Sequence, residues 1–195
     1  MSTLEVGKIV PATGTDVTLG DSGDTFTIPA SATLTVAGAI NASSGTATGF
    51  GDNKPAFHVY LTATQSIPNT TNTKIELDTA ILDTASGFNL TASGTNPYSY
   101  TVSVAGTYLI QTGLAMDDID DGEYARLMVY KNGVRTNASD VIFYSSASNQ
   151  TAFMGKCFME SLAVDDYIAL WVYHNEGGSL NITGTHVFLS GFKLF

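Results

Sequence analysis

The chain lacks the cysteine pairs that cross-link many small proteins. One cysteine among 195 residues excludes an internal disulfide, and no apolar run approaches the length of a membrane-spanning helix. Charged residues make up only 13 % of the chain, about half of the share usual in soluble domains. Stability must therefore come from a packed core, for which 44 % apolar residues are sufficient.

Basic residues are especially scarce. Eight lysines and arginines stand against eighteen acidic residues, which gives a net charge of −10. Nucleic-acid binding requires basic patches that replace phosphate counterions, and anionic membranes repel an acidic protein. We therefore expect no nucleic-acid partner and no membrane insertion. The first residues, Met1 to Val6, lack a basic and an apolar region, so we expect no secretion signal either.

Helical periodicity is missing too, whereas short alternating segments between turn residues are frequent, which is typical of an all-β protein. The turn at Asn132-Gly133 predicts a hairpin. The alternating segments predict strands at 56–63, 73–80, 98–102, 106–115, 124–131, 151–162, 166–174 and 185–195. Antiparallel strands of this number and length predict a two-sheet jelly-roll head.

The composition divides the chain into three parts. Residues 1–44 are of low complexity and contain three short pieces with apolar side chains two apart, namely Val17-Thr-Leu19, Phe26-Thr-Ile28 and Leu34-Thr-Val36. We predict that three copies wind together here into a short β-rich stem, and a flexible arm is the alternative. Residues 45–51 form a glycine-rich linker, and residues 52–195 form the head.

The segment Tyr167–His174 is apolar on both of its alternating faces, although a strand of a lone sandwich is usually polar on one of them. One face can pack in the core of the head. The other is most simply covered by a neighbouring copy of the chain, so the segment predicts self-association.

Candidate catalytic groups are few, and we expect neither an enzyme nor a cofactor. Gly20-Asp-Ser-Gly23 resembles a protease nucleophile motif, but no histidine precedes it to act as the base. His58, His174 and His186 lack the spacing of metal ligands, and we expect His174 at the surface of a strand end. Apolar neighbours predict that Cys157 is a buried, unreactive thiol.

One segment carries an acidic cluster, made up of Asp117, Asp118, Asp120 and Asp121. Oxygen-rich loops bind calcium, but Ile119 and Met128 stand where an EF-hand needs oxygen ligands. We expect a solvated loop, with a looser calcium site as the alternative.

Five segments of the head form an ordered set of motifs: 57–61 with 65–78, then Tyr100 to Leu109, Val129-Tyr-Lys-Asn-Gly133, Leu162 to Tyr173, and Phe188-Leu-Ser-Gly-Phe192. Together they resemble the tumour-necrosis-factor-like family, in particular its complement globular-head branch. The resemblance covers nearly all of 52–195. In this chain Tyr100 replaces the usual phenylalanine, Val104 a proline and Asp165 a glycine.

That resemblance implies a ten-stranded jelly roll that forms tight homotrimers, binds ligands on the sides or top of the trimer, and is not an enzyme. It also places a set of aromatic residues either near the three-fold axis or in the core, and it does not distinguish between these two positions. They are Tyr108, Trp171, Tyr173 and Phe192.

The stem carries a second resemblance. Leu19 to Pro29, residues 32–36 and residues 45–51 are similar to bacteriophage fibre and virion structural proteins. The first expectation is therefore a trimeric virion protein, a tail fibre or spike, whose stem contacts other virion proteins. Its head would bind a host-surface glycan or protein, with 89–98 and 144–149 as contacting loops.

Three alternatives to the tail fibre remain open. The same trimer fits a capsid decoration or head-fibre protein. It also fits a secreted recognition ligand of the complement globular-head type. A glycan-cleaving enzyme on a fibre scaffold is the third.

Overall fold

The head is described by a computed structural model that covers residues 55–136, 139–182, 184 and 186–194, with a few isolated residues between 25 and 37. The predicted stem at 1–44 and linker at 45–51 therefore lie outside the continuously described residues. No helix in these ranges is long and apolar enough to span a membrane.

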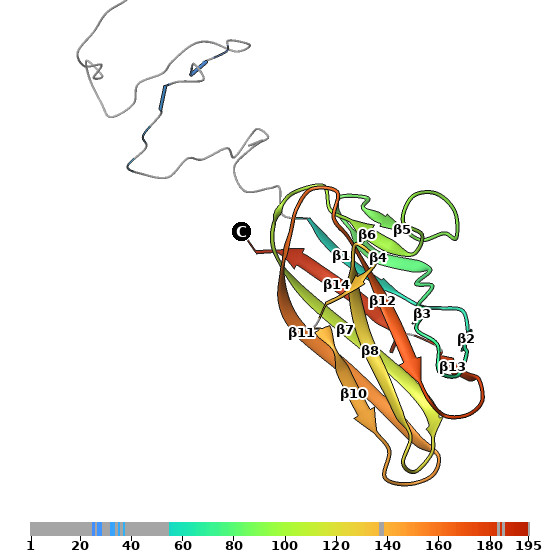
Figure 1. Cartoon of the computed structure of the whole chain (residues 1–195). Coiled ribbons are helices and arrows are strands. Elements are labelled where there is room, and N and C mark those ends of the chain that lie inside the picture. Colours follow the sequence, from blue (N-terminus) through green and yellow to red (C-terminus); the bar gives the residue numbers. More distant parts are fainter. Residues whose placement is uncertain are drawn as a thin grey trace, which may run out of the picture. The chain divides into compact units, whose positions relative to one another are not determined.

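One antiparallel sheet, sheet A, has five strands in a simple row (Figure 1). Their order is β4 (Thr79–Asp83), β1 (Ala56–Tyr60), β14 (Phe188–Lys193), β7 (Gly106–Ile119) and β11 (Gln150–Leu162). Two short segments complete the sheet. β13 (Leu180–Ile182) pairs with β7 at Met116, past the part of β7 that pairs with β14, and β2 (Gln65–Ile67) pairs with β13.

The second sheet, sheet B, faces sheet A across the core. Its main order is β10 (Val141–Tyr144), β8 (Tyr124–Lys131), β12 (Tyr167–His174), β6 (Ser99–Thr101) and β5 (Phe88–Asn89). Two short segments join it, β3 (Thr73–Lys74) beside β12 and β9 (Val134–Arg135) beside β8. The prediction of an all-β jelly-roll sandwich is confirmed. The described residues hold fourteen strand segments rather than ten, because several are pieces of two or three residues.

The core forms where alternate side chains of the two sheets meet, as the period of a strand requires. On β12 the apolar side chains that point into the core are Ile168, Leu170 and Val172. Across the core, Phe57 of β1 stacks on Tyr100 of β6, with ring centroids 4.1 Å apart. One face of each strand is thereby committed to the core, and the opposite face is left for other contacts.

Tyr108 belongs to this core. Its ring is fully buried, and its hydroxyl donates a hydrogen bond of 2.7 Å to the carbonyl of Val104. Replacing it by phenylalanine leaves that carbonyl without this donor, so we expect Tyr108→Phe to lower the free energy of unfolding by about 1 kcal/mol. Denaturant titration measures the loss. A change in oligomeric state with unchanged stability would instead place Tyr108 at a subunit contact.

The predicted hairpin at Asn132-Gly133 joins β8 to β9. Both residues have positive φ, 52° and 76°, as the type I′ turn of a tight hairpin requires. The amide of Asn132 donates a hydrogen bond of 2.7 Å to the carboxylate of Asp166. Asp166 also accepts from the backbone N–H of Ala163 and pairs with Lys131 at 3.1 Å. One carboxylate thus fastens the turn before β12 to this hairpin.

Hydrogen bonds from Asn132 and Ala163, together with the charge of Lys131, lower the pKa of Asp166 below its usual 3.8. A lowered pKa in the folded state contributes stability above the unfolded pKa, and this contribution is lost as the pH falls through the folded value. We expect Asp166→Asn to destabilise the head at pH 7 but not near pH 2. Thermal unfolding at both pH values measures this, and an equal loss at both would exclude the charge as its cause.

Candidate subunit-interface site

The side of sheet A that points away from the core is apolar, and we call it the open face. Its side chains lie in cross-strand rows set by the register. One row runs from Ala56 through Phe192 and Leu109 to Met159, across β1, β14, β7 and β11. Phe192 is 46 % and Met159 62 % exposed. Phe153 of β11, 71 % exposed, extends the face toward the far end of β7.

The next row is more polar at its centre. His58 lies opposite Ser190, which lies opposite Gln111 of β7. The Nδ1 of His58 and the hydroxyl of Ser190 are hydrogen bonded, and the imidazole leans against Phe188 with ring centroids 5.5 Å apart. These contacts hold β1 against β14, so His58 and Ser190 serve the sheet itself.

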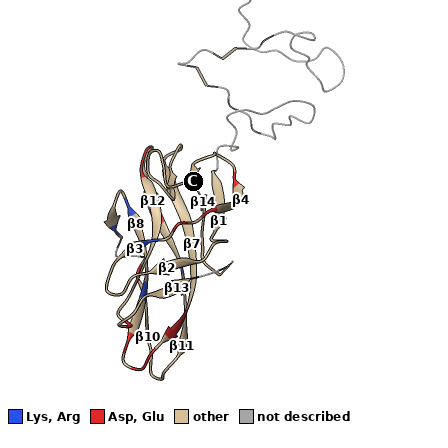
Figure 2. Ribbon diagram, turned by 90° about the vertical axis from the view of Figure 1, so that its right-hand side faces the viewer, with Lys and Arg blue, Asp and Glu red and all other residues tan. Residues whose placement is uncertain are grey.

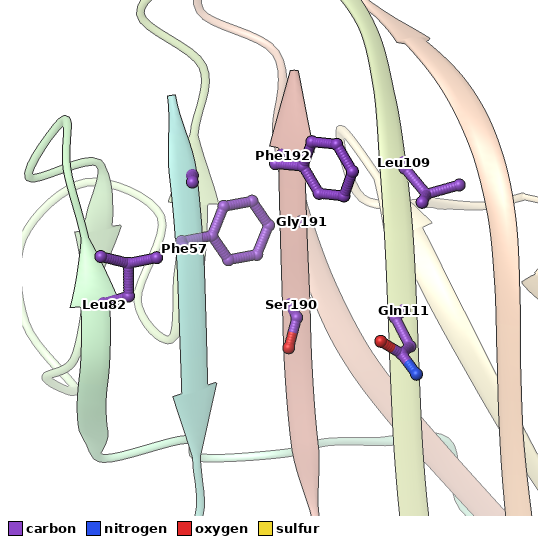
Figure 3. A pocket seen from close by; sticks show the side chains of 8 residues that line it. Phe57, Leu82, Leu109, Gln111, Ser190, Gly191 and Phe192 are labelled. Atoms are coloured by element: carbon purple, nitrogen blue, oxygen red, sulfur yellow. The ribbon is translucent and has the colours of Figure 1, made fainter. Parts of the chain in front are cut away.

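A shallow pocket of about 140 Å³ opens in the middle of this face. Figure 3 shows Phe192, Leu109 and Gln111 around it, with Leu82 of β4 on the opposite side. Gly191 also lines the pocket, and its missing side chain lies on the core side, because a Cβ there would lie 2.7 Å from the buried ring of Phe57. The open face thus offers a hollow lined mainly by apolar groups.

Formal charge is absent from this part of sheet A. On β1, β14, β11 and β7 from Thr107 to Ala115, no side chain of the described open face is Asp, Glu, Lys or Arg. Acidic residues instead lie toward both ends of the head (Figure 2). Depletion of charge combined with exposed aromatic and methionine side chains is the composition found at the centre of protein–protein interfaces.

The structure separates the four aromatic residues that the resemblance grouped. Tyr108 lies in the core and Phe192 on the open face. Trp171 and Tyr173 lie on the outer face of sheet B, where Trp171 stacks on Tyr130 with centroids 4.5 Å apart. The second apolar face of β12 is thus partly covered by its own chain. A neighbouring copy is therefore not required there, and the exposed apolar face lies on sheet A.

Two further expectations are corrected. Cys157 is exposed on the open face instead of buried, because β11 is an edge strand whose apolar side chains alternate between two faces. His174 is fully buried instead of exposed: its Nε2 contacts the carbonyl of Ile67 at 3.0 Å, and its Nδ1 accepts from the N–H of Glu176.

The acidic cluster is only partly a loop, because β7 extends to Ile119 and includes Asp117 and Asp118. The carboxylate of Asp117 accepts a hydrogen bond of 2.6 Å from the hydroxyl of Thr151, and that of Asp120 accepts one from the N–H of Asn149. No group of three His, Cys, Asp or Glu side chains within the described ranges is arranged to hold a metal ion.

Comparisons with known proteins bear on the fold of the head. No protein-family model matches the chain, and no curated protein matches it. Solved structures do. Murine APRIL has a TM-score of 0.53 and 17 % identity over 72 % of this chain and 99 % of its own. Eiger TNF from S. frugiperda has a TM-score of 0.54 and 14 % identity, over 73 % of this chain and 93 % of its own.

The globular domain of zebrafish complement 1qA protein aligns with a TM-score of 0.47 and 16 % identity, over 72 % of this chain and 98 % of its own. Identities this low establish the fold alone. The head of this chain is therefore a jelly roll of the tumour-necrosis-factor type, as its ordered motifs predicted.

Proposed function

We propose that the protein is a non-catalytic recognition module that works as a homotrimer, with its subunits joined through the open face of sheet A. The observation that carries this proposal is the uncharged apolar face that spans four strands and is exposed in the single chain. Exposed apolar patches of this extent mark surfaces that bind another protein. A second copy of the chain is the partner always present with it.

The proposal of three subunits has separate support. The ordered motifs of the head resemble a family of trimers, and Eiger TNF shares the fold. Of the expected roles, these findings favour a recognition ligand of the complement globular-head type over a tail fibre. A place on a virion, in the tail or on the capsid, is a second proposal. It rests on the stem motifs at 19–51 alone.

Cys157 supplies a direct test of the proposed interface, because it lies on the open face opposite Gln111. In the assembled protein its thiol would be covered. Val134 lies on β9 of the other sheet and is 69 % exposed. A Val134→Cys variant therefore carries one exposed thiol on each sheet.

We expect a maleimide reagent to label position 134 within minutes and Cys157 about tenfold more slowly or less, as measured by peptide mass spectrometry. Labelling in denaturant provides the reference in which both thiols are free. Equal labelling of both thiols in the native protein would show that the open face is uncovered and would contradict the proposal.

A further inference from the structure

The outer face of sheet B carries three tyrosines from three neighbouring strands, which we call the outer tyrosine cluster. They are Tyr144 of β10, Tyr124 of β8 and Tyr173 of β12. The ring of Tyr124 lies between the other two, with centroids 5.5 Å from Tyr144 and 5.6 Å from Tyr173. Tyr144 is 68 % exposed. The cluster is therefore a shallow aromatic platform with hydroxyl groups.

Arg126 lies within this platform. The register places it between Ile142 and Tyr173, and its guanidinium carbon is 5.9 Å from the centre of the Tyr124 ring. The Nε of Arg126 is buried and has no hydrogen-bond partner among the described residues. Within the same ranges its guanidinium forms no ion pair, whereas Arg135 pairs with Asp140 at 3.7 Å. Buried N–H donors normally have a hydrogen-bond acceptor. The unpaired Nε of Arg126 is therefore an exception that a bound ligand could satisfy.

Lys74 shows the contrast on the same face of sheet B. Its ammonium group lies 5.7 Å from the ring centre of Trp171, but it also donates to the carbonyl of Pro97 at 3.0 Å and reaches the hydroxyl of Ser99 at 3.5 Å. The cation over Trp171 is thus satisfied within the chain and has a structural role. The guanidinium of Arg126 near Tyr124, in contrast, has no hydrogen-bond acceptor for its Nε among the described residues.

We propose that the outer tyrosine cluster and Arg126 form a binding site for an acidic saccharide. A sugar ring stacks on the exposed ring of Tyr144, and the carboxylate of the sugar accepts hydrogen bonds from Arg126. Tyrosine is suited to this role, because it offers a rigid, amphipathic surface at little cost in conformational entropy. The inference deepens the proposed recognition function and rests on it.

Charge limits the ligand to one acidic group per site. Arg126 already occupies the Tyr124 ring as a cation, so a cationic ligand would be repelled. Polyanions would be repelled by the chain as a whole, whose net charge is −10. A hydrogen bond with Tyr124 raises the pKa of Tyr173; the charge of Arg126 opposes this shift, and the nearby carboxylate of Glu123 adds to it. Glu123 thus adds negative charge beside the cluster and disfavours a second anionic group.

The site stays accessible in the proposed assembly. The outer tyrosine cluster lies on the outer face of sheet B, whereas the proposed subunit contacts use the open face of sheet A, on the opposite side of the sandwich. A trimer would therefore present three such sites at once. Weak single contacts would then add up through avidity on a surface that carries many copies of the saccharide.

The test uses the full chain on immobilised glycans in matched pairs that differ only in an acidic sugar, such as 3′-sialyllactose with lactose and galacturonate with galactose oligomers. A glutamate-rich peptide is the third probe. We expect an acidic member to bind the chain at least about tenfold more strongly than its neutral partner, the amount that one charge-assisted hydrogen-bond pair provides. Tyr144→Ala and Arg126→Gln should each abolish this preference, and Val134→Ala should leave it intact.

Equal binding of neutral and acidic glycans, stronger binding of the peptide, or no binding of any probe would overturn the inference. Cys157 labelling on the same samples separates this failure from that of the proposed function. Protected thiols without glycan selectivity would exclude the saccharide site and leave the trimer. Open thiols with intact selectivity would exclude the trimer and leave the site.

Discussion

Phe192→Asp is expected to convert the assembled protein into folded monomers. The side chain lies in the central apolar row of the open face, beside the pocket and opposite Leu109. The free energy of association loses about 2 kcal/mol for each phenylalanine ring that is no longer buried. An unpaired carboxylate in a dry interface costs several kcal/mol more. Together these losses weaken association by at least about a hundredfold. Size-exclusion chromatography with light scattering measures the shift, and circular dichroism checks that the fold persists.

Val134→Asp is the matched control, because it introduces the same charge at an exposed position of β9 in sheet B. It should leave the oligomeric state unchanged. If both variants dissociate, the added negative charge on an already acidic chain is responsible. If neither dissociates, the subunits meet elsewhere and the open face is not their interface.

Gly191→Ala is expected to destabilise the head itself. A Cβ at this position would lie 2.7 Å from Cζ of Phe57 and 2.9 Å from Cδ1 of Ile110. Phe57 cannot yield easily, because it is buried and stacked on Tyr100. Overpacking a core in this way costs about 2 kcal/mol, which lowers the melting temperature of a domain of this size by about 4–8 °C.

Gly178→Ala is the corresponding control, because nothing lies within 4 Å of a Cβ placed there. We expect a melting temperature close to that of the unmodified chain. An unchanged melting temperature for Gly191→Ala would show that the core around Phe57 is more loosely packed than the contacts indicate. A similar loss in both variants would point to the backbone preference of glycine instead.

The long strands were accessible to sequence analysis because their side chains alternate over many residues. The strand β8 was predicted with its observed bounds, 124–131. The strand β10 was missed, since its four residues, Val141–Tyr144, are too few to show a period before the serines that follow. Tyr144 was therefore placed in a loop, although it ends a strand. Short edge segments depend on pairing with a neighbour, which one sequence does not reveal.

The candidate site was harder to predict than the fold. The strand β11 has apolar side chains on both faces, so the sequence does not separate Phe153, Cys157 and Met159 of the open face from Ala152 and Met154 of the core side. Register decides this, because it aligns Met159 with Leu109. The period of β12 was recognised correctly, but Trp171 is covered by Tyr130, which lies on a neighbouring strand and 41 positions earlier in the sequence.

Arg126 illustrates the same limit. In the sequence it is one arginine within an apolar strand, and nothing distinguishes it from Arg135. Only the pairing of β8 with β10 and β12 places it among three tyrosines, and among the described residues it forms no ion pair. The two faces of the sandwich then differ in character. Sheet A presents an uncharged surface suited to another copy of the chain, and sheet B presents an aromatic surface with an unsatisfied cation.

Sedimentation velocity of the purified full-length chain at nanomolar concentration tests the association through the open face most directly. The account predicts one species with three times the 20.5 kDa mass of the chain. A single, well-folded species of 20.5 kDa at this and at micromolar concentration would contradict it.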